Sequence, residues 1–271
     1  MLDQIQSASN YIKSVYGGAP KIGIILGSGL NGFIDFMAVE LEINYADIPH
    51  FPISTVEGHT GKLILGQVAG VEVIVMSGRF HFYEGYSPEE VVFPVRVMKF
   101  MGVTDLLISN AAGGVKPGFK VGDLMIIKDH ISFSIVNPLL GKNYSELGPR
   151  FPDMSEPYSK AYIKKAYEVA DAYGIQIQEG VYFGVTGPTF ETRAEYKLIK
   201  TLGADAVGMS TVQEVIAAVH CGMRVFAMSV ITDIGIREED NVITHAEVLD
   251  AAKNAAPNLA LVFKGMVEKI K

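Results

Sequence analysis

The amino-acid sequence predicts an α/β fold, a central mixed and partly parallel β-sheet flanked by helices, in a single domain over residues 1–271. The first observation behind this prediction is a short, continuous apolar run, Ile22 to Leu26, that leads into a glycine-rich turn. Such a run is too short for a buried helix and too apolar for a half-exposed strand, so it indicates a buried parallel strand. The second observation is the alternation of β-rich runs with segments of helical periodicity, which favours helices on both faces of the sheet.

The remaining elements follow from the same two periodicities. Residues 2–16 place apolar side chains at helical spacing and predict a surface helix ahead of the first strand. Lys62 to Met76 contains two β-rich runs around Ala69 and Gly70, which is typical of a hairpin. Further strands are expected at Asp105 to Ser109, Leu124 to Ile127, Gly180 to Val185 and Arg224 to Ile231. Helices are expected at Pro88 to Met101, Tyr158 to Tyr173, Thr192 to Leu202, Val212 to Cys221 and His245 to Lys269.

The composition excludes several classes of partner. The net charge of -7 argues against a nucleic-acid or anionic-membrane surface, because phosphate backbones are bound chiefly by clustered Lys and Arg. No window approaches the ~18 apolar residues that a membrane-spanning helix needs, and no secretion leader is recognised, so we expect a cytoplasmic protein. The one cysteine, Cys221, excludes an internal disulfide and fits a reducing compartment. No cluster of Cys, His and carboxylates has the spacing of a metal site, so no metal is expected.

The turn after the first strand, Gly27-Ser28-Gly29, predicts a phosphate cradle. Glycines bring backbone N–H groups close to an oxyanion, and the positive end of a following helix would add to the attraction. Gly27, Gly29 and Gly32 also satisfy the pattern G-x-G-x-x-G, so a nicotinamide-dependent oxidoreductase is a distant alternative. A dinucleotide site needs a second buried strand ending in an acid about 20 residues on. Residues 40–52 contain no comparable apolar run, which weakens this alternative.

Polar side chains follow each of the predicted strands. Because ligands of open α/β sheets bind beyond the carboxyl ends of the strands, we expect these loops to converge on one site. The residues concerned are Ser28 after the first strand, Arg79 and His81 after the hairpin, Asn110, the GPTFET segment at 187–192, and Thr232 with Asp233.

Arg79 and His81 are the main candidates for binding an anion. They stand two residues apart, so on an extended segment both side chains leave by the same face. A surface arginine beside a helix-capping histidine is the alternative. Glu84 is expected to hold Arg79 in place. His59 lies in a glycine-rich loop, where a histidine is as often a plain surface group as a ligand.

Other segments suit either ligand binding or local structure. The small residues of Asn110 to Gly114 allow the backbone to approach a ligand, or form a tight turn. Phe190 and Glu191 could stack on a planar heterocycle and accept a hydrogen bond from its ring N–H, or could belong to a helix start. Ser210 precedes a predicted helix, which fits both an N-cap and a phosphate contact. His245, taken alone, favours a structural role at the start of the last helix.

Taken together, these segments resemble the trimeric purine nucleoside phosphorylases, a family close to the methylthioadenosine phosphorylases. The matching stretches are ILGSGL, VEGHTGKL, SGRFHFYEGY, SNAAGG, NPLLG to RFPDMSEPY, GPTFET, GADAVGMSTVQEVIAA and THAEV, in the expected order over nearly the whole chain. The resemblance implies reversible phosphorolysis, in which a purine (deoxy)ribonucleoside and inorganic phosphate give a free purine and (deoxy)ribose 1-phosphate. It also implies a homotrimer that needs no metal or organic cofactor, with phosphate as co-substrate.

The same resemblance assigns the candidate residues to parts of the substrates. The phosphate site would comprise Ser28, His59, Arg79, His81, the Ala111 N–H and Ser210. The sugar would contact Tyr83, Met209 and His245, with His245 at the 5′-hydroxyl. The base would meet Phe190, Asp233 and Glu191, which accepts from the N1 hydrogen. His81, Glu191 and Asp233 would be catalytic. The residues that lie behind the contact residues would be Glu84, Asn110, Tyr182 and Val248.

Two positions depart from the family pattern. An aromatic that the family often lends to the neighbouring subunit is Leu147 here, and an asparagine near the end of the late strand is Asp233. Asparagine donates and accepts hydrogen bonds, whereas an ionised aspartate only accepts. We expect burial and the nearby Glu191 to favour a protonated Asp233, which would donate to N7 or O6 and act as general acid.

Base preference therefore separates the remaining hypotheses. We expect 6-oxopurine nucleosides (inosine, guanosine) to be preferred, with more tolerance of 6-amino bases than an asparagine enzyme would show. A 5′-methylthioadenosine phosphorylase is the main alternative. Asp233 favours this alternative, whereas Glu191 and His245 argue against it. His245 would have no 5′-hydroxyl to bind in methylthioadenosine. A non-catalytic nucleoside- or phosphate-binding protein is disfavoured by the many ionisable side chains expected at one site.

Overall fold

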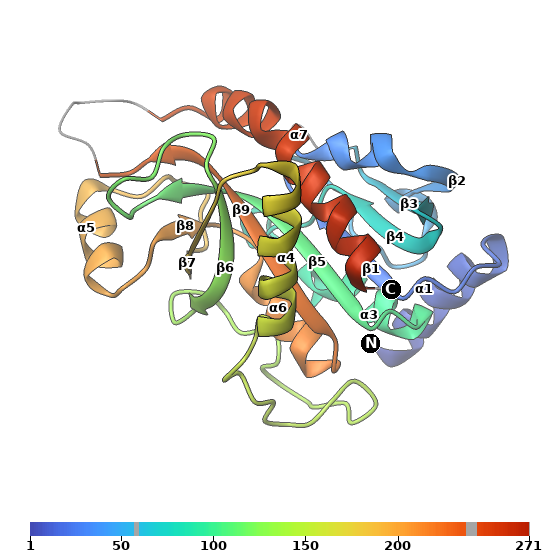
Figure 1. Cartoon of the computed structure of the whole chain (residues 1–271). Helices are drawn as coiled ribbons and strands as arrows, with labels where there is room; N and C mark the ends of the chain where they lie inside the picture. The colour runs from blue at the N-terminus through green and yellow to red at the C-terminus, as the bar shows by residue number, and fades with distance from the viewer. Residues whose placement is uncertain (57–59, 237–242, 271) are drawn as a thin grey trace.

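A mixed sheet runs through the whole molecule, and its second part closes on itself (Figure 1). The computed structural model describes residues 1–56, 60–236 and 243–270. The described strands form one nine-stranded sheet in the order β2-β3-β4-β1-β5-β8-β7-β6-β9, and β9 pairs with β5 as well as with β6. The strands are β1 (Ile22–Leu26), β2 (Ala38–Asn44), β3 (Lys62–Val68), β4 (Val71–Ser77), β5 (Asp105–Gly114), β6 (Leu124–Ile131), β7 (Ile177–Gly184), β8 (Ala206–Gly208) and β9 (Arg224–Ile234).

The predicted mixture of parallel and antiparallel pairing is confirmed. Parallel pairs join β4, β1, β5 and β9, whereas β3 pairs antiparallel with both β2 and β4. All of β1 is buried between its two parallel neighbours, which explains its continuous apolar sequence. Because β9 lies between β5 and β6, the strands from β5 to β9 form a closed ring, which was not predicted.

Helices cover both faces of the sheet, as expected. One apolar core lies under α1 (Leu2–Val15), α3 (Phe93–Met101) and α6 (Val212–His220). The other lies under α4 (Lys160–Tyr173) and α7 (His245–Ile270), which cross the front of Figure 1. A smaller cluster packs under α5 (Arg193–Thr201). The short helices are α2 (Pro88–Val91) and the 3₁₀ helices η1 (Asn31–Phe36), η2 (Tyr45–Asp47) and η3 (Phe82–Glu84).

Two predicted helices take a different form. The segment from Pro88 to Met101 is broken at Val92, because Pro94 has no N–H to donate to the Glu90 carbonyl in a continuous helix. The helix expected after the glycine turn of β1 is present as the 3₁₀ helix η1, which has only 6 residues and therefore a small dipole. The turn itself depends on Gly29, whose φ of 74° lies in the region that favours glycine.

Other strands were missed or predicted too short. β2 is an edge strand with mostly exposed side chains, so it lacks the apolar pattern of a core strand. β8 has 3 residues, which is too short to show any periodicity. The segment Asn110 to Gly114 is not a turn but the second half of β5. The chain also passes from β1 to an antiparallel edge strand instead of a parallel neighbour, so the strand–helix–strand unit of a dinucleotide site is absent from residues 22–44.

Candidate active site

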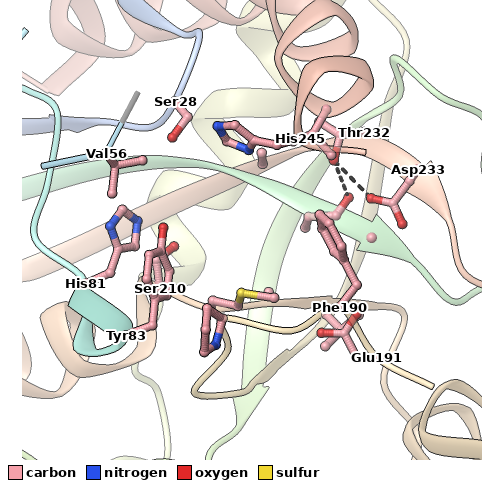
Figure 2. Close-up of a pocket in the computed structure, with 18 of the residues that line it drawn as sticks. Ser28, Val56, His81, Tyr83, Phe190, Glu191, Ser210, Thr232, Asp233 and His245 are labelled. Atoms are coloured by element: carbon pink, nitrogen blue, oxygen red, sulfur yellow. Dashed lines mark hydrogen bonds between the residues drawn. The ribbon is translucent and has the colours of Figure 1, made fainter. Parts of the chain in front are cut away.

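The loops that follow the strands converge on one pocket, as the sequence predicted (Figure 2). Its volume is about 390 Å³, and it lies where the carboxyl ends of β1, β4, β5, β8 and β9 meet. The predicted residues that line it are Ser28, Arg79, His81, Tyr83, Ala111, Phe190, Glu191, Met209, Ser210, Asp233, His245 and Val248. His59 lies outside the described residues.

Arg79 is buried at one end of the pocket and is held in a fixed orientation. Its Nε and one terminal nitrogen donate to the two carboxylate oxygens of Glu214, each at 3.0 Å. The other terminal nitrogen donates to the Ser109 carbonyl at 2.8 Å and lies 3.4 Å from the Ser210 hydroxyl. The expectation that Glu84 holds Arg79 is therefore wrong, because the bidentate partner is Glu214 on α6.

Glu84 instead orients His81. Its Oε1 lies 3.0 Å from His81 Nδ1 and accepts from the His81 backbone N–H at 2.8 Å, while Oε2 accepts from the Thr55 N–H at 3.0 Å. Burial alone would raise the pKa of Glu84, but the hydrogen bonds from His81 and Thr55 lower it to about 2. Burial lowers the pKa of His81, against the effect of Glu84. A neutral His81 therefore donates from Nδ1 and presents Nε2 as an acceptor.

Tyr83 extends the same end of the pocket toward its middle. Its ring stacks on the His81 ring with centroids 4.6 Å apart and planes 16° from parallel. Burial raises the pKa of its hydroxyl to about 12, so the hydroxyl keeps its proton at neutral pH. Met209 and His245 line the pocket beyond it, and His245 begins α7 as predicted.

A strained turn places Ser210 in the pocket. Thr211 has a φ of 71°, which is rare for a β-branched residue, and the Val212 N–H donates to the Ser210 carbonyl at 2.8 Å across it. Behind the turn, the Asn110 amide donates to the Thr211 hydroxyl at 2.8 Å, and the Ser210 N–H lies 3.5 Å from the Tyr182 hydroxyl. Asn110 and Tyr182 thus support the turn from behind, as their predicted place implies.

The opposite end of the pocket carries an aromatic ring and two carboxyl groups. Phe190 is 39% exposed, so one face of its ring is open to a ligand. Burial raises the pKa of Glu191, and the charge of Asp233 raises it further. The Asp233 carboxyl lies between two hydroxyls, with Oδ1 at 3.2 Å from Thr232 and Oδ2 at 3.3 Å from Tyr196.

A family model described as the phosphorylase superfamily matches residues 21–268. The chain belongs to the phosphorylase superfamily. It is 50% identical over 267 residues to purine nucleoside phosphorylase 1 of Bacillus subtilis, with 98% of each chain covered. It is 49% identical over 266 residues to purine nucleoside phosphorylase 1 of Geobacillus stearothermophilus, covering 98% of this chain and 97% of the relative.

Solved structures agree with this placement in the phosphorylase superfamily. Isoform 2 of Schistosoma mansoni purine nucleoside phosphorylase, solved with cytosine and ribose-1-phosphate, has a TM-score of 0.95 at 43% identity and covers 99% of this chain and 97% of its own. Schistosoma purine nucleoside phosphorylase structures with hypoxanthine and with adenosine each have a TM-score of 0.95 at 40% identity, covering 100% of this chain and 98% of their own. The predicted fold class is confirmed.

Sequence reasoning missed three residues of this phosphorylase-superfamily site. Glu214 is the partner of Arg79, and a single carboxylate among the apolar residues of TVQEVIAAV was the available signal. Tyr196 lines the pocket but shares the apolar stripe of α5 with Ile199, so its periodicity predicts only a core residue. Val56 precedes the residues outside the description, and nothing in its sequence context marks it.

No group of three or more His, Cys, Asp or Glu side chains that could hold a metal ion occurs among residues 1–56, 60–236 and 243–270. Within those same ranges, no helix has both the length and the apolar character needed to cross a bilayer.

Proposed function

We propose that this phosphorylase-superfamily member is a purine nucleoside phosphorylase that transfers a (deoxy)ribosyl group reversibly between a purine and inorganic phosphate. The observation that carries the proposal is that the two ends of one pocket carry different kinds of side chain. His81 and Ser210 lie at one end, and Phe190 and Glu191 lie at the other. Arg79 lines the pocket beside Ser210, whose hydroxyl is 3.4 Å away. Relatives that carry this name at 49% and 50% identity over nearly the full chain support it.

The end of the pocket around Arg79 suits inorganic phosphate. The Arg79 guanidinium is fixed by Glu214, and the hydroxyls of Ser28 and Ser210 line the pocket with it. The Ala111 N–H and His59 complete the proposed phosphate site. Because neutral His81 presents Nε2 as an acceptor, it can take a hydrogen bond from a phosphate oxygen that carries a proton.

The middle of the pocket suits the sugar, and the far end suits the purine. Tyr83, Met209 and His245 line the same pocket and are assigned to the sugar, with His245 at the 5′-hydroxyl. Phe190 offers a ring for stacking on the purine. Glu191 accepts from the N1 hydrogen of a 6-oxopurine. Val248, which was expected behind the contact residues, lines the pocket itself.

The mechanism follows from the movement of charge. As the bond from the sugar C1′ to purine N9 breaks, its electron pair goes to the purine, and a phosphate oxygen forms the new bond to C1′. The sugar carbon is cationic at this point, so the neighbouring phosphate anion stabilises it. A proton from Asp233 to N7 would neutralise the leaving purine. Positioning two substrates in one pocket accounts for up to ~7–11 kcal/mol of barrier reduction, without a metal, an organic cofactor or a covalent enzyme intermediate.

The experiment that tests the proposal measures turnover of inosine, guanosine, adenosine and methylthioadenosine, each with and without inorganic phosphate. We expect strictly phosphate-dependent cleavage with 6-oxopurine nucleosides preferred. Undiminished turnover in phosphate-free buffer would overturn the proposal.

A methylthioadenosine phosphorylase is the second candidate, and Asp233 at the base end favours it because an ionised carboxylate accepts from a 6-amino group. Preference for methylthioadenosine over inosine in the same assay would establish it. We further propose that the enzyme is a cytoplasmic homotrimer whose partners are the nucleoside and phosphate.

A further inference from the structure

Tyr196 has no role in the proposed reaction so far, yet it lines the base end of the pocket. It lies on α5 and is 3% exposed. Its ring packs among apolar side chains that include Phe183, Ile199 and Val207. The apolar part of the side chain is therefore anchored in a small core, while its hydroxyl hydrogen-bonds the carboxyl groups of both Asp233 and Glu191.

The two oxygens of Asp233 are contacted from different elements. Thr232 on β9 lies 3.2 Å from Oδ1, and Tyr196 on α5 lies 3.3 Å from Oδ2. Figure 2 shows Asp233 beside Thr232 and facing the side of the pocket that carries Phe190 and Glu191. The orientation of this carboxyl therefore depends on a side chain from a separate helix.

The packing around this pair leaves little room for another arrangement. A Cβ at Gly235, just after β9, would lie 2.0 Å from the Tyr196 ring. A Cβ at Gly113 on β5 would lie 3.0 Å from Asp233 Oδ2 and 3.2 Å from the Tyr196 hydroxyl. Glycine at both positions allows the ring, the hydroxyl and the carboxyl to pack together.

The Tyr196 hydroxyl is a donor in this setting. Burial raises its pKa well above the usual value for tyrosine, and the charges of Asp233 and Glu191 raise it further. A donor on a carboxylate stabilises the ionised form of that carboxyl, whereas a neighbouring carboxylate such as Glu191 destabilises it. The same hydroxyl hydrogen-bonds Glu191 and lowers its pKa, so its one proton is shared between the two carboxyl groups. Donated to Oδ2, that proton opposes the effect of Glu191 on Asp233.

We propose that Tyr196 is a specificity-determining positioning residue, which keeps the Asp233 carboxyl oriented as a hydrogen-bond acceptor for the 6-amino group of a purine. The inference rests on the proposed function, in which Asp233 faces the base. An ionised Asp233 accepts from a 6-amino group but repels a 6-oxo group, whereas a protonated Asp233 can donate to a 6-oxo group. The preference between 6-amino and 6-oxo purines therefore depends on whether a hydrogen-bond donor contacts Oδ2 of Asp233.

The test is Tyr196→Phe, which removes the hydroxyl and keeps the ring. We expect kcat/KM for adenosine to fall and the ratio of inosine to adenosine kcat/KM to rise about 10-fold, the size of one lost hydrogen bond to a charged group. The phosphate KM is expected to stay unchanged. The matched control is Tyr167→Phe, because the Tyr167 hydroxyl also lies 3.3 Å from a carboxylate, Glu179, and Tyr167 is not among the pocket residues.

A second measurement separates a role through Asp233 from a purely structural one. In an Asp233→Asn background, Tyr196→Phe should change the inosine-to-adenosine ratio much less, since only its hydrogen bond to Glu191 is then left to lose. An equal loss with both substrates, or the same change of ratio with and without Asp233, would overturn the inference. Absence of phosphorolysis in the unmodified enzyme would overturn the proposed function itself, and this inference with it.

Discussion

Arg79 is the residue on which phosphate binding should depend most. Arg79→Ala should raise the phosphate KM by an amount that corresponds to about 2–4 kcal/mol, because a buried anion loses a charge-assisted partner. Glu214, left buried and unpaired, would add repulsion. Arg79→Ala combined with Glu214→Gln removes that repulsion and should recover part of the phosphate affinity. Steady-state kinetics at varied phosphate measure both variants, and an unchanged phosphate KM in Arg79→Ala would remove Arg79 from the site.

Asp233 is the residue that should decide base selectivity. Asp233→Asn keeps a donor toward O6 or N7 and removes the carboxylate, so it should retain inosine activity and lower adenosine kcat/KM by about 10-fold or more. Parallel kinetics on inosine and adenosine test this. If the base preference does not change, Asp233 is a structural residue at the strand end and its proposed acid role is wrong.

The same substitution should also alter the pH profile. Burial and the charge of Asp233 raise the pKa of Glu191, which must be ionised to accept from N1. Activity on inosine therefore falls as the pH drops through this raised pKa, and Asp233→Asn should move that fall to lower pH. The pH dependence of kcat/KM for inosine measures this shift.

What the sequence could not predict at the residue scale was pairing across the fold. Arg79 and Glu84 stand close in sequence, which made them natural partners, but the bidentate partner of Arg79 comes from α6. The contact between Tyr196 and Asp233 could not be predicted for the same reason. The position of Tyr196 on the apolar stripe of α5 does not indicate that it lies near Asp233 on β9. The pocket residues at the strand ends could be predicted, because each of them follows its strand directly in the sequence.

At the scale of an element, η3 shows how a short helix positions a pocket residue. Glu84 receives hydrogen bonds from His81 and Thr55, which lower its pKa to about 2 from an ordinary 4.5. A carboxyl group whose pKa is lower in the folded state than in the unfolded state stabilises the fold fully at pH values above its unfolded-state pKa. This stabilisation is lost as the pH falls toward the folded-state pKa. Glu84 therefore stabilises the native state above about pH 4.5 and loses that effect toward pH 2.

Glu84→Gln should accordingly lower the free energy of unfolding by about 1–2 kcal/mol at pH 7, since charge-assisted hydrogen bonds become neutral ones. The difference from the unmodified enzyme should shrink as the pH falls below about 4.5. Denaturant titrations over this pH range measure it. Glu90→Gln is the matched control, because Glu90 caps α2 through Ser87 in the way that Glu84 caps η3 through His81. Glu90→Gln should leave the phosphate KM unaltered, whereas Glu84→Gln should raise it. A pH-independent difference would contradict the assigned charge of Glu84.

The elements themselves were predictable where one face or both faces were buried. β1, the hairpin of β3 and β4, and the helices α1, α4, α5, α6 and α7 lie within a few residues of their expected bounds. β2 and β8 were missed for opposite reasons, since one is exposed and the other is only 3 residues long. The closed ring from β5 to β9 depends on which strands pair, and that is a long-range property that apolar periodicity does not contain.

At the scale of the whole molecule, the surface carries several widely exposed large apolar side chains. Phe133, Leu140 and Phe151 are 71%, 64% and 87% exposed. Leu147, at the position where the family lends an aromatic to its neighbour, is 3% exposed and packs in the core of its own chain. Any contact that this segment makes across a subunit boundary must therefore come from more exposed residues, of which Phe151 is the nearest large apolar one in sequence.

We expect the unmodified enzyme to sediment as a trimer at micromolar concentration and Phe151→Asp to shift it toward monomer. Burying an unpaired carboxylate at a subunit boundary costs more than the lost apolar contact, so a single substitution should suffice. Val15→Asp is the matched control, because Val15 is 48% exposed on α1, far along the chain from Phe151, and should leave the assembly intact. A stable monomer in the unmodified enzyme would contradict the trimer, while a trimer that persists in Phe151→Asp would remove Phe151 from the interface. If the subunits do separate, inosine kinetics on the monomer test whether one chain alone completes the sugar site.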